Sequence, residues 1–158
     1  MTLNCYSRKF LSGRKYAYCI LIVAVSLISC RPSDKWTNHP NSEDTKIAWK
    51  LFELFNSHDW KTMSELYIDS ALFLDPSFGK KEIIKTQIQT ASKYAAMQKI
   101  FPNIKDEVQH MYSFENNVIV EFISSGADSN GHGFSLPIVT IFTIKDGKIT
   151  RDATYYDQ

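Results

Sequence analysis

The feature that most constrains the fold is a period-two alternation of apolar and polar residues along the C-terminal part of the chain. Successive side chains of a β-strand point to opposite faces, so this alternation predicts strands. Asn116–Asn117 and the Asp146–Gly147 pair interrupt it with residues that are typical of hairpin turns. The alternating segments predict strands over residues 104–114, 118–125, 134–144 and 149–156. We therefore expect a four-stranded antiparallel meander.

Helical spacing replaces this alternation in the preceding part of the sequence. Apolar residues recur every three or four positions from Asp44 to Phe55, and Asp59 is a natural N-cap for a second, short helix. Pro102 stops a third helical segment. We expect helices over residues 44–55, 60–67 and 81–99, one short strand over 71–74, and a turn over 75–79.

The order of these elements predicts an α+β fold, in which N-terminal helices cover one face of a curved, mostly antiparallel sheet. A chain of 158 residues is long enough for one domain with a substantial core. Its composition, 44% apolar and 13% aromatic, is that of a folded protein and excludes a disordered chain.

The first 29 residues have the composition of an export signal. Arg8, Lys9, Arg14 and Lys15 are their only charged residues, and the apolar segment 17–28 follows. This segment has 12 residues, whereas a transmembrane helix needs roughly 20. A basic segment followed by a short apolar one is typical of a secretory signal peptide.

The end of the apolar segment resembles a bacterial lipobox. In that motif a small residue, here Ser29, precedes a cysteine that is lipidated and becomes the first residue of the mature protein, here Cys30. An ordinary cleaved signal and an uncleaved anchor are the alternatives. Because each buried methylene contributes roughly 0.8 kcal/mol, two or three acyl chains would hold a domain stably on a membrane. We therefore expect a lipid anchor at Cys30, on the extracytoplasmic side of a bacterial membrane.

This interpretation divides the chain into three parts. We expect a signal peptide over residues 1–29, the lipidated cysteine and a flexible tether over 30–43, and a folded domain over 44–158. Arg31 follows the cysteine. An acidic residue at that position would favour retention in the inner membrane, so the outer membrane is favoured if the source is Gram-negative.

Charge and cysteine content exclude several classes of function. The chain has 18 basic and 17 acidic residues, and removal of residues 1–29 leaves 14 against 17, a formal charge of −3. This balance argues against nucleic-acid binding. Cys5 and Cys19 would leave with the signal peptide, and the four histidines lack metal-ligand spacing. Nucleotide-binding and nucleophile motifs are also missing from the sequence, so neither a metal nor a cofactor is expected.

Several short motifs occur in an order that resembles a known family. They are Phe55–Trp60, Leu66–Tyr67, Phe73–Pro76, Phe101–Asn103, Asp146–Ile149 and Tyr155–Asp157. Together, over residues 44–157, they resemble the SnoaL-like branch of the nuclear-transport-factor-2-like superfamily. The resemblance implies a cone-shaped fold with a pocket between the helices and the concave face of the sheet. The superfamily includes ketosteroid isomerase, polyketide cyclases, scytalone dehydratase and pockets without known chemistry, so it implies a fold rather than a function.

Alternation along the strands, combined with the resemblance, sorts side chains between the pocket and the outer face. The expected pocket is apolar with a few polar groups, which suits a small hydrophobic or aromatic ligand. Its expected lining residues are Leu51, Val118, Val120, Phe122, Leu136, Ile138, Thr140, Thr154 and Tyr156.

Asp75 is the strongest candidate for catalysis. The resemblance matches it to the general base of ketosteroid isomerase, in the same Asp-Pro context at the end of a strand. An apolar pocket disfavours the charged form of a carboxyl group, so we expect its pKa to rise toward a range useful for proton transfer. The alternative is that Asp75 caps the turn that follows it.

Two further groups are candidates for proton transfer. Alternation directs Asp152 inward, where it could form an acid–base pair with Asp75. The alternatives for Asp152 are pairing with Arg151 or with a neighbouring strand, and a solvated position at the pocket mouth. His110 follows Val108 in the inward register, although a lone histidine on an apolar face is more often a core residue.

The other functional groups of ketosteroid isomerase do not carry over to this sequence. Under the resemblance, the tyrosine that binds the oxyanion falls at Leu51 and the protonated aspartate falls at Thr140. Loss of one such donor typically lowers a rate by roughly 10²–10³. Ketosteroid isomerisation is therefore not expected.

Three functions remain as hypotheses. The first is a membrane-anchored domain that binds a small hydrophobic or aromatic ligand. The second is a pocket enzyme, a lyase, isomerase or cyclase, that uses Asp75 with Asp152 or His110. The third is an interaction module, or a homodimer, in which the outer sheet face with Ile119 and Ile123 packs against a partner.

Overall fold

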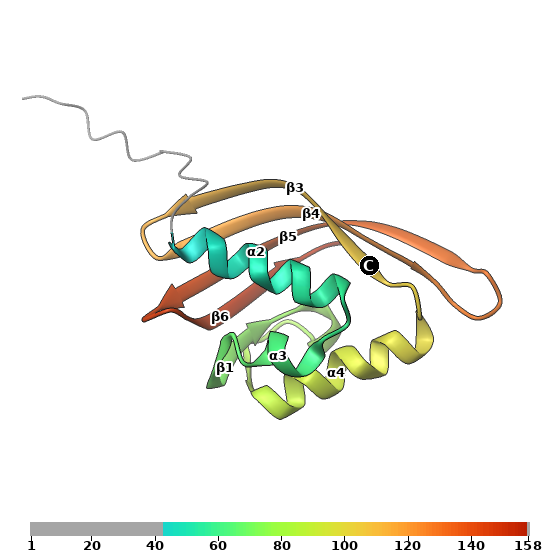
Figure 1. Cartoon of the computed structure of the whole chain (residues 1–158), viewed down its shortest axis with the longest axis horizontal. Helices are drawn as coiled ribbons and strands as arrows, with labels where there is room; N and C mark the ends of the chain where they lie inside the picture. The colour runs from blue at the N-terminus through green and yellow to red at the C-terminus, as the bar shows by residue number, and fades with distance from the viewer. Residues whose placement is uncertain (1–42, 158) are drawn as a thin grey trace, which may run out of the picture. The chain divides into compact units, whose positions relative to one another are not determined.

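The computed structural model of the chain describes residues 43–157. These residues form an α+β fold, in which three helices lie on the concave side of a curved, six-stranded sheet (Figure 1). The expected signal peptide, Cys30 and nearly all of the expected tether lie outside the described residues. Within residues 43–157, no helix is both long enough and apolar enough to cross a bilayer.

Helix α2 (Glu43–Asn56) supplies much of the core, as its spacing predicts. Its buried face includes Leu51, Phe52 and Phe55. The ring of Phe52 meets those of Phe122 and Phe142 edge-on, with centroids 5.0 and 6.3 Å apart. Such pairs contribute roughly 0.5–1.5 kcal/mol beyond the burial of their area. The core therefore fills the space between α2 and the inner face of the sheet.

Helix α3 (Trp60–Ser64) begins at the predicted N-cap but ends earlier than predicted. The carboxylate of Asp59 accepts a hydrogen bond from the backbone N–H of Thr62 over 3.1 Å. Tyr67 is not helical, because it pairs with Ile149 at the start of strand β1 (Tyr67–Leu74). The strand is thus twice the predicted length, since pairing with a distant strand overrides the local helical spacing.

Strand β2 (Ile83–Thr86) occupies the first part of the segment that was predicted as a helix. It pairs antiparallel with β1, and Ile84 lies opposite Leu72. Two adjacent β-branched residues, Ile83 and Ile84, favour this extended conformation. Helix α4 (Gln87–Ile100) starts only afterwards, where Thr86 and Gln89 form a capping box.

The predicted meander is confirmed. It consists of β3 (Lys105–Phe114), β4 (Asn117–Ala127), β5 (Gly133–Lys145) and β6 (Lys148–Tyr155). The sheet has the order β2-β1-β6-β5-β4-β3, and β1 runs parallel to β6. This parallel pair joins the early strands to the meander, so β1 and β6 end on the same side of the domain.

Candidate functional site

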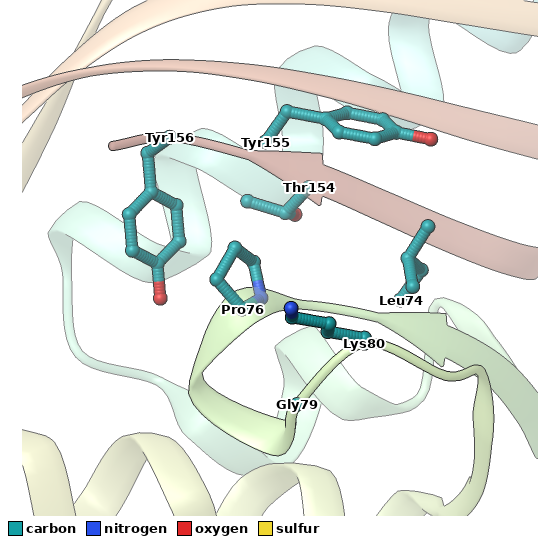
Figure 2. A pocket seen from close by; sticks show the side chains of 7 residues that line it. All are labelled: Leu74, Pro76, Gly79, Lys80, Thr154, Tyr155 and Tyr156. Carbon is teal, nitrogen blue, oxygen red and sulfur yellow. The ribbon is translucent and has the colours of Figure 1, made fainter. Parts of the chain in front are cut away.

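A pocket of about 500 Å³ opens where β1 and β6 end (Figure 2). Parallel pairing sets Leu74 beside Ala153, so the two strands finish together. The chain then enters a 3₁₀ turn, η1 (Pro76–Phe78), and leaves it at Gly79, whose φ of 101° favours glycine. The lining residues are Leu74, Pro76, Gly79, Lys80, Thr154, Tyr155 and Tyr156.

Asp75 lies directly behind this turn and is 8% exposed. Its Oδ1 accepts hydrogen bonds from the backbone N–H of Ser77 over 2.8 Å and from the Ser77 hydroxyl over 2.7 Å. The hydroxyl of Tyr156 donates to the same oxygen over 3.0 Å. The ammonium group of Lys93, on α4, lies 2.6 Å from Oδ2. Asp75 therefore caps the turn, as the structural alternative predicts, and also joins α4 to the end of β6.

The ion pair determines the charge of Asp75. Burial, the largest influence, raises the pKa of its carboxyl, but the charge of Lys93 and hydrogen bonds from Lys93 and Ser77 together bring that pKa below its usual value. The expectation of a raised pKa is therefore wrong, because the sequence indicated the burial but not the cation. Asp75 is ionised at neutral pH.

Asp152, on β6, points inward as alternation predicts and is 5% exposed. The Tyr67 hydroxyl donates to Oδ2 over 2.8 Å, while the hydroxyls of Thr140 and Thr154 donate to Oδ1 over 2.8 and 3.1 Å. Arg151 instead pairs with Glu82 over 2.6 Å. Asp152 thus pairs with the neighbouring strand β5 through Thr140, as one of the structural alternatives predicts, and neither forms an ion pair with Arg151 nor lies in water.

Burial raises the pKa of the Asp152 carboxyl, and hydrogen bonds from Tyr67 and Thr140 oppose the shift without cancelling it. Asp75 and Asp152 thus have pKa values shifted in opposite directions. The different environments follow from their neighbours, because Asp75 contacts an ammonium group whereas Asp152 contacts neutral hydroxyls.

Two residues connect the pocket to these carboxyl groups. Thr154 lines the pocket and donates to Asp152, while Tyr156 lines the pocket and donates to Asp75. The carboxyl groups are not themselves lining residues. Each one therefore lies a single hydrogen bond behind the wall, where it fixes the orientation of a hydroxyl that a ligand can reach.

Seven of the nine expected lining residues do not line this pocket. Five are buried: Leu51, Val118, Val120, Phe122 and Thr140. Leu136 and Ile138 are half-buried on β5. Four of the buried residues belong to the hydrophobic core, against which Ile138 packs. Of the expected residues, Thr154 and Tyr156 line the pocket, as the sequence predicts.

The expected inward position of His110 is wrong. A β-bulge in β3 pairs Val108 with Phe122 but His110 with Glu121, so one extra residue enters the strand between them. An extra residue reverses which face the following side chains occupy. His110 is consequently exposed and shares the outer face with Glu121. It does not join Asp75 and Asp152.

Sequence reasoning missed three residues of this site. Tyr67 was assigned to a helix, and Lys93 was given no role within the predicted helix 81–99, although both donate to the buried carboxyl groups. Lys80 lies in the pocket wall after the glycine turn. The Asp-Pro-Ser-Phe-Gly turn signal could have indicated Lys80, since residues that follow a tight turn often border a cleft. No comparable signal marks Lys93.

The arrangement can hold a small molecule against apolar walls and exchange hydrogen bonds or protons with it through two hydroxyls. Across residues 43–157, no three His, Cys, Asp or Glu side chains gather in a way that could hold a metal ion. The chemistry of this end of the domain is thus carried by carboxyl, hydroxyl and ammonium groups.

The sequence of residues 49–152 matches the SnoaL-like domain family. Among curated proteins, none has a matching sequence. Several solved structures have the same fold at identities too low to transfer function.

One is IdmH from Streptomyces antibioticus, a candidate polyketide cyclase, at 20% identity, TM-score 0.65, and coverage of 73% of this chain and 93% of that one. Another is an LEH-like epoxide hydrolase from M. tuberculosis, at 16% identity, TM-score 0.63, and coverage of 73% and 83%. A third is a candidate SnoaL-like polyketide cyclase from Jannaschia sp. CCS1, at 18% identity, TM-score 0.62, and coverage of 81% and 91%.

Proposed function

The chain belongs to the SnoaL-like domain family, and we propose that it binds a small hydrophobic or aromatic ligand in the pocket at the ends of β1 and β6. The volume of about 500 Å³ suits a molecule of one to three fused rings. Leu74, Pro76 and the rings of Tyr155 and Tyr156 provide apolar surface. Thr154 and the Tyr156 hydroxyl provide polar contacts that can orient a ligand.

One observation carries this proposal: the hydroxyl groups of two wall residues, Thr154 and Tyr156, are each held by a buried carboxyl group. Tyr156 donates to Asp75 over 3.0 Å and Thr154 donates to Asp152 over 3.1 Å. A site whose polar groups are already oriented loses less entropy when a ligand binds. Because both carboxyl groups lie behind the wall, the geometry favours recognition of a ligand over direct attack on it.

Amide NMR of the full chain in detergent micelles tests this proposal. The probe is 2-naphthamide, a neutral aromatic molecule, with empty micelles as the reference for partitioning. We expect saturable shifts of the Thr154 and Tyr156 signals. Leu74→Trp, which fills part of the pocket, should abolish them. Leu72→Trp is the matched control, because Leu72 lies on the same strand, is 38% exposed and is not a lining residue. Saturation that survives Leu74→Trp would contradict the proposal.

A second function, proton-transfer catalysis, is favoured by the opposite pKa shifts of the two carboxyl groups. Pairs of titratable groups with pKa values pushed apart are typical of acid–base sites. Asp75, with its lowered pKa, would accept a proton through Tyr156. Asp152, with its raised pKa, would supply one through Thr154. The cyclases and the epoxide hydrolase among the similar structures are consistent with this reading.

Hydrolysis of styrene oxide tests the second function. Water adds to one epoxide carbon, the carbon–oxygen bond breaks, the water proton goes to Asp75, and the alkoxide takes a proton from Asp152. Chromatography would detect the diol. We expect Asp152→Asn to reduce diol formation while 2-naphthamide still binds. Diol formation no faster than in buffer would remove this candidate and leave binding as the function.

We further propose that a lipid on Cys30 anchors the domain on the extracytoplasmic side of a bacterial membrane. The basic and apolar segments before Cys30 support this proposal, and Arg31 favours the outer membrane in a Gram-negative source. The test is Cys30→Ser, which should move the protein from the membrane fraction to the soluble fraction. Continued membrane association of Cys30→Ser would contradict the anchor.

The outer sheet face supports homodimer formation as a proposal. Tyr112 and Val139 are 39% and 37% exposed on this face, and Ile119 and Ile123 between them are half-buried. Apolar surface of this kind is typical of protein contacts. Analytical ultracentrifugation should give a dimer for the native chain and a monomer for Ile119→Glu. A native monomer at high concentration would contradict the proposal.

A further inference from the structure

The pocket contains one cation, and its charge is not neutralised within the described part of the chain. Lys80 lines the pocket, and in Figure 2 its side chain extends across the turn below Thr154, with the ammonium group toward Pro76. None of the ion pairs or hydrogen bonds among residues 43–157 includes the Lys80 ammonium group. Lys80 is thus free to bind a group that the ligand brings.

The carboxylates that could neutralise Lys80 already have other contacts. Asp75 contacts Lys93 at 2.6 Å and also accepts from Ser77 and Tyr156. Glu82, two positions after Lys80, pairs with Arg151 at 2.6 Å. Asp157 is exposed and is not a lining residue. The nearby acidic groups therefore leave a positive charge at the pocket.

The rest of the wall is apolar or neutral. Leu74, Pro76 and Tyr155 offer aliphatic and aromatic surface, while Thr154 and Tyr156 offer hydroxyls whose protons point to buried carboxyl groups. A ligand that fits such a wall has an apolar body and one negative group. A positively charged group on the ligand would be repelled by the ammonium group of Lys80.

We propose that the pocket selects amphipathic monoanions, that is, aromatic or aliphatic ring systems with one carboxylate, and that Lys80 binds the carboxylate. This inference rests on the proposed ligand-binding function. An ion pair in open water contributes little. Lys80 is exposed, and the apolar body of a ligand that lies against the wall would shield one side of the pair from water, which strengthens a charge-assisted hydrogen bond. Hydrogen bonds to charged groups correspond to an affinity gain of about tenfold or more.

A matched pair of probes tests the inference on the full chain in detergent micelles. 2-Naphthoate and 2-naphthamide have nearly the same shape and differ by one negative charge. We expect the NMR titration of the Thr154 and Tyr156 signals to give a Kd about tenfold lower for the carboxylate. Salt should reduce this preference, because ions screen a partly exposed pair.

Three variants locate the effect. Lys80→Gln should remove the preference for 2-naphthoate, so that the two probes bind with equal Kd values, while Lys80→Arg should keep the preference. Lys145→Gln is the matched control, because Lys145 is also exposed and is the last residue of β5, beside the turn that precedes β6, whereas the pocket lies at the other end of β6. It should change neither Kd.

The outcomes separate this inference from the proposed function. Equal Kd values for the two probes, or a preference that survives Lys80→Gln, would overturn the inference while ligand binding stands. Failure of both probes to shift the pocket signals would overturn the inference together with the proposed function.

Discussion

Asp75 and Asp106 are equally buried, at 8% exposure each, yet their surroundings give them opposite charge behaviour. Asp75 lies at the pocket end of β1, and its pKa is lowered although burial alone raises it. Asp106 lies near the start of β3, and burial raises its pKa to about 7. Equal solvent exposure of the two residues thus accompanies opposite pKa shifts.

The contacts of the two carboxyl groups explain the difference. Both oxygens of Asp75 accept hydrogen bonds, and Lys93 provides a full positive charge at 2.6 Å. At Asp106, the side chain of Asn56 binds both backbone groups, each over 2.8 Å. The carboxyl of Asp106 gains only a hydrogen bond with Ser124, and its Oδ1 has no hydrogen-bond partner.

Asp152 is surrounded by hydroxyl donors, and the charge of Lys93, which forms its ion pair with Asp75, also lowers the pKa of Asp152. Three hydroxyls donate to its carboxyl group, yet its pKa remains raised because burial outweighs them. The comparison indicates that the number of hydrogen bonds matters less than a nearby opposite charge. At the pocket, the ion pair therefore keeps Asp75 charged and keeps the Tyr156 hydroxyl oriented toward it.

Lys93→Met is expected to have the largest effect, because it removes the cation and leaves Asp75 buried without it. Breaking a buried ion pair by removal of one partner costs about 3 kcal/mol or more, and both side chains here are at most 20% exposed. Urea unfolding at pH 7 should show a loss of about 3 kcal/mol. Lys99→Met, an exposed position on the same helix, is the control.

The pH dependence of this loss has a defined sign. A carboxyl with a lowered pKa stabilises the folded state above its unfolded pKa of about 3.9, and the contribution disappears as the pH falls through the folded pKa. The difference between Lys93→Met and the native chain should therefore shrink below about pH 4. A difference that is constant with pH would mean that Lys93 acts through packing on Phe78 and Tyr94 instead.

Asp106→Asn should have the opposite consequence and stabilise the protein. Asp106 binds its proton more tightly when folded, so its contribution is present below about pH 4 and is lost as the pH rises to about 7. The amide keeps the shape and never ionises. At pH 8 we expect Asp106→Asn to be more stable than the native chain, with no gain at pH 4. Destabilisation at both pH values would show that Asp106 has a charged partner.

Tyr67→Phe should have a smaller effect, because it removes one of three hydrogen bonds to Asp152. Loss of a buried hydrogen bond to a carboxyl costs about 1.5 kcal/mol. The pKa of Asp152 should also rise further, since the Tyr67 hydrogen bond is the main influence that lowers it. Thermal unfolding and carbon-13 titration measure these effects. Phe73 stacks on the Tyr67 ring at 5.2 Å and should hold the ring of the variant in place.

The sequence predicted the fold class and the inner face of the meander because period-two alternation is a local signal. Thr154, Tyr156 and Asp152 were placed correctly, because the irregularity in the β5–β6 register lies before them, between Ile149 and Arg151, and the pairing is regular from there to Tyr155. His110 was misplaced because the bulge at residues 108–110 is a property of the paired strands rather than of β3 alone. Alternation therefore predicts the facing of a residue only as far as the next irregularity.

The site could not be predicted in full because its partners come from elements whose ends depend on distant pairing. Tyr67 became part of β1 through its pairing with Ile149, 82 positions later in the chain. Lys93, on α4, contacts Asp75 from 18 positions later in the chain, and β2 takes residues 83–86 from the helix that was predicted there. The sequence pattern gave no sign of this contact, and the pKa of Asp75 was predicted in the wrong direction.

The central claim is that the positive charge of Lys93, rather than burial alone, determines the ionisation of the Asp75 carboxyl group at the pocket. Carbon-13 titration of the aspartate side chains in the full chain tests this claim most directly. We predict that the carboxyl signal of Asp75 titrates below the ordinary aspartate range and that of Asp106 titrates near pH 7. At pH 5.5 the two groups would then carry different charges at equal burial. Titration of both signals at the same pH would contradict the account.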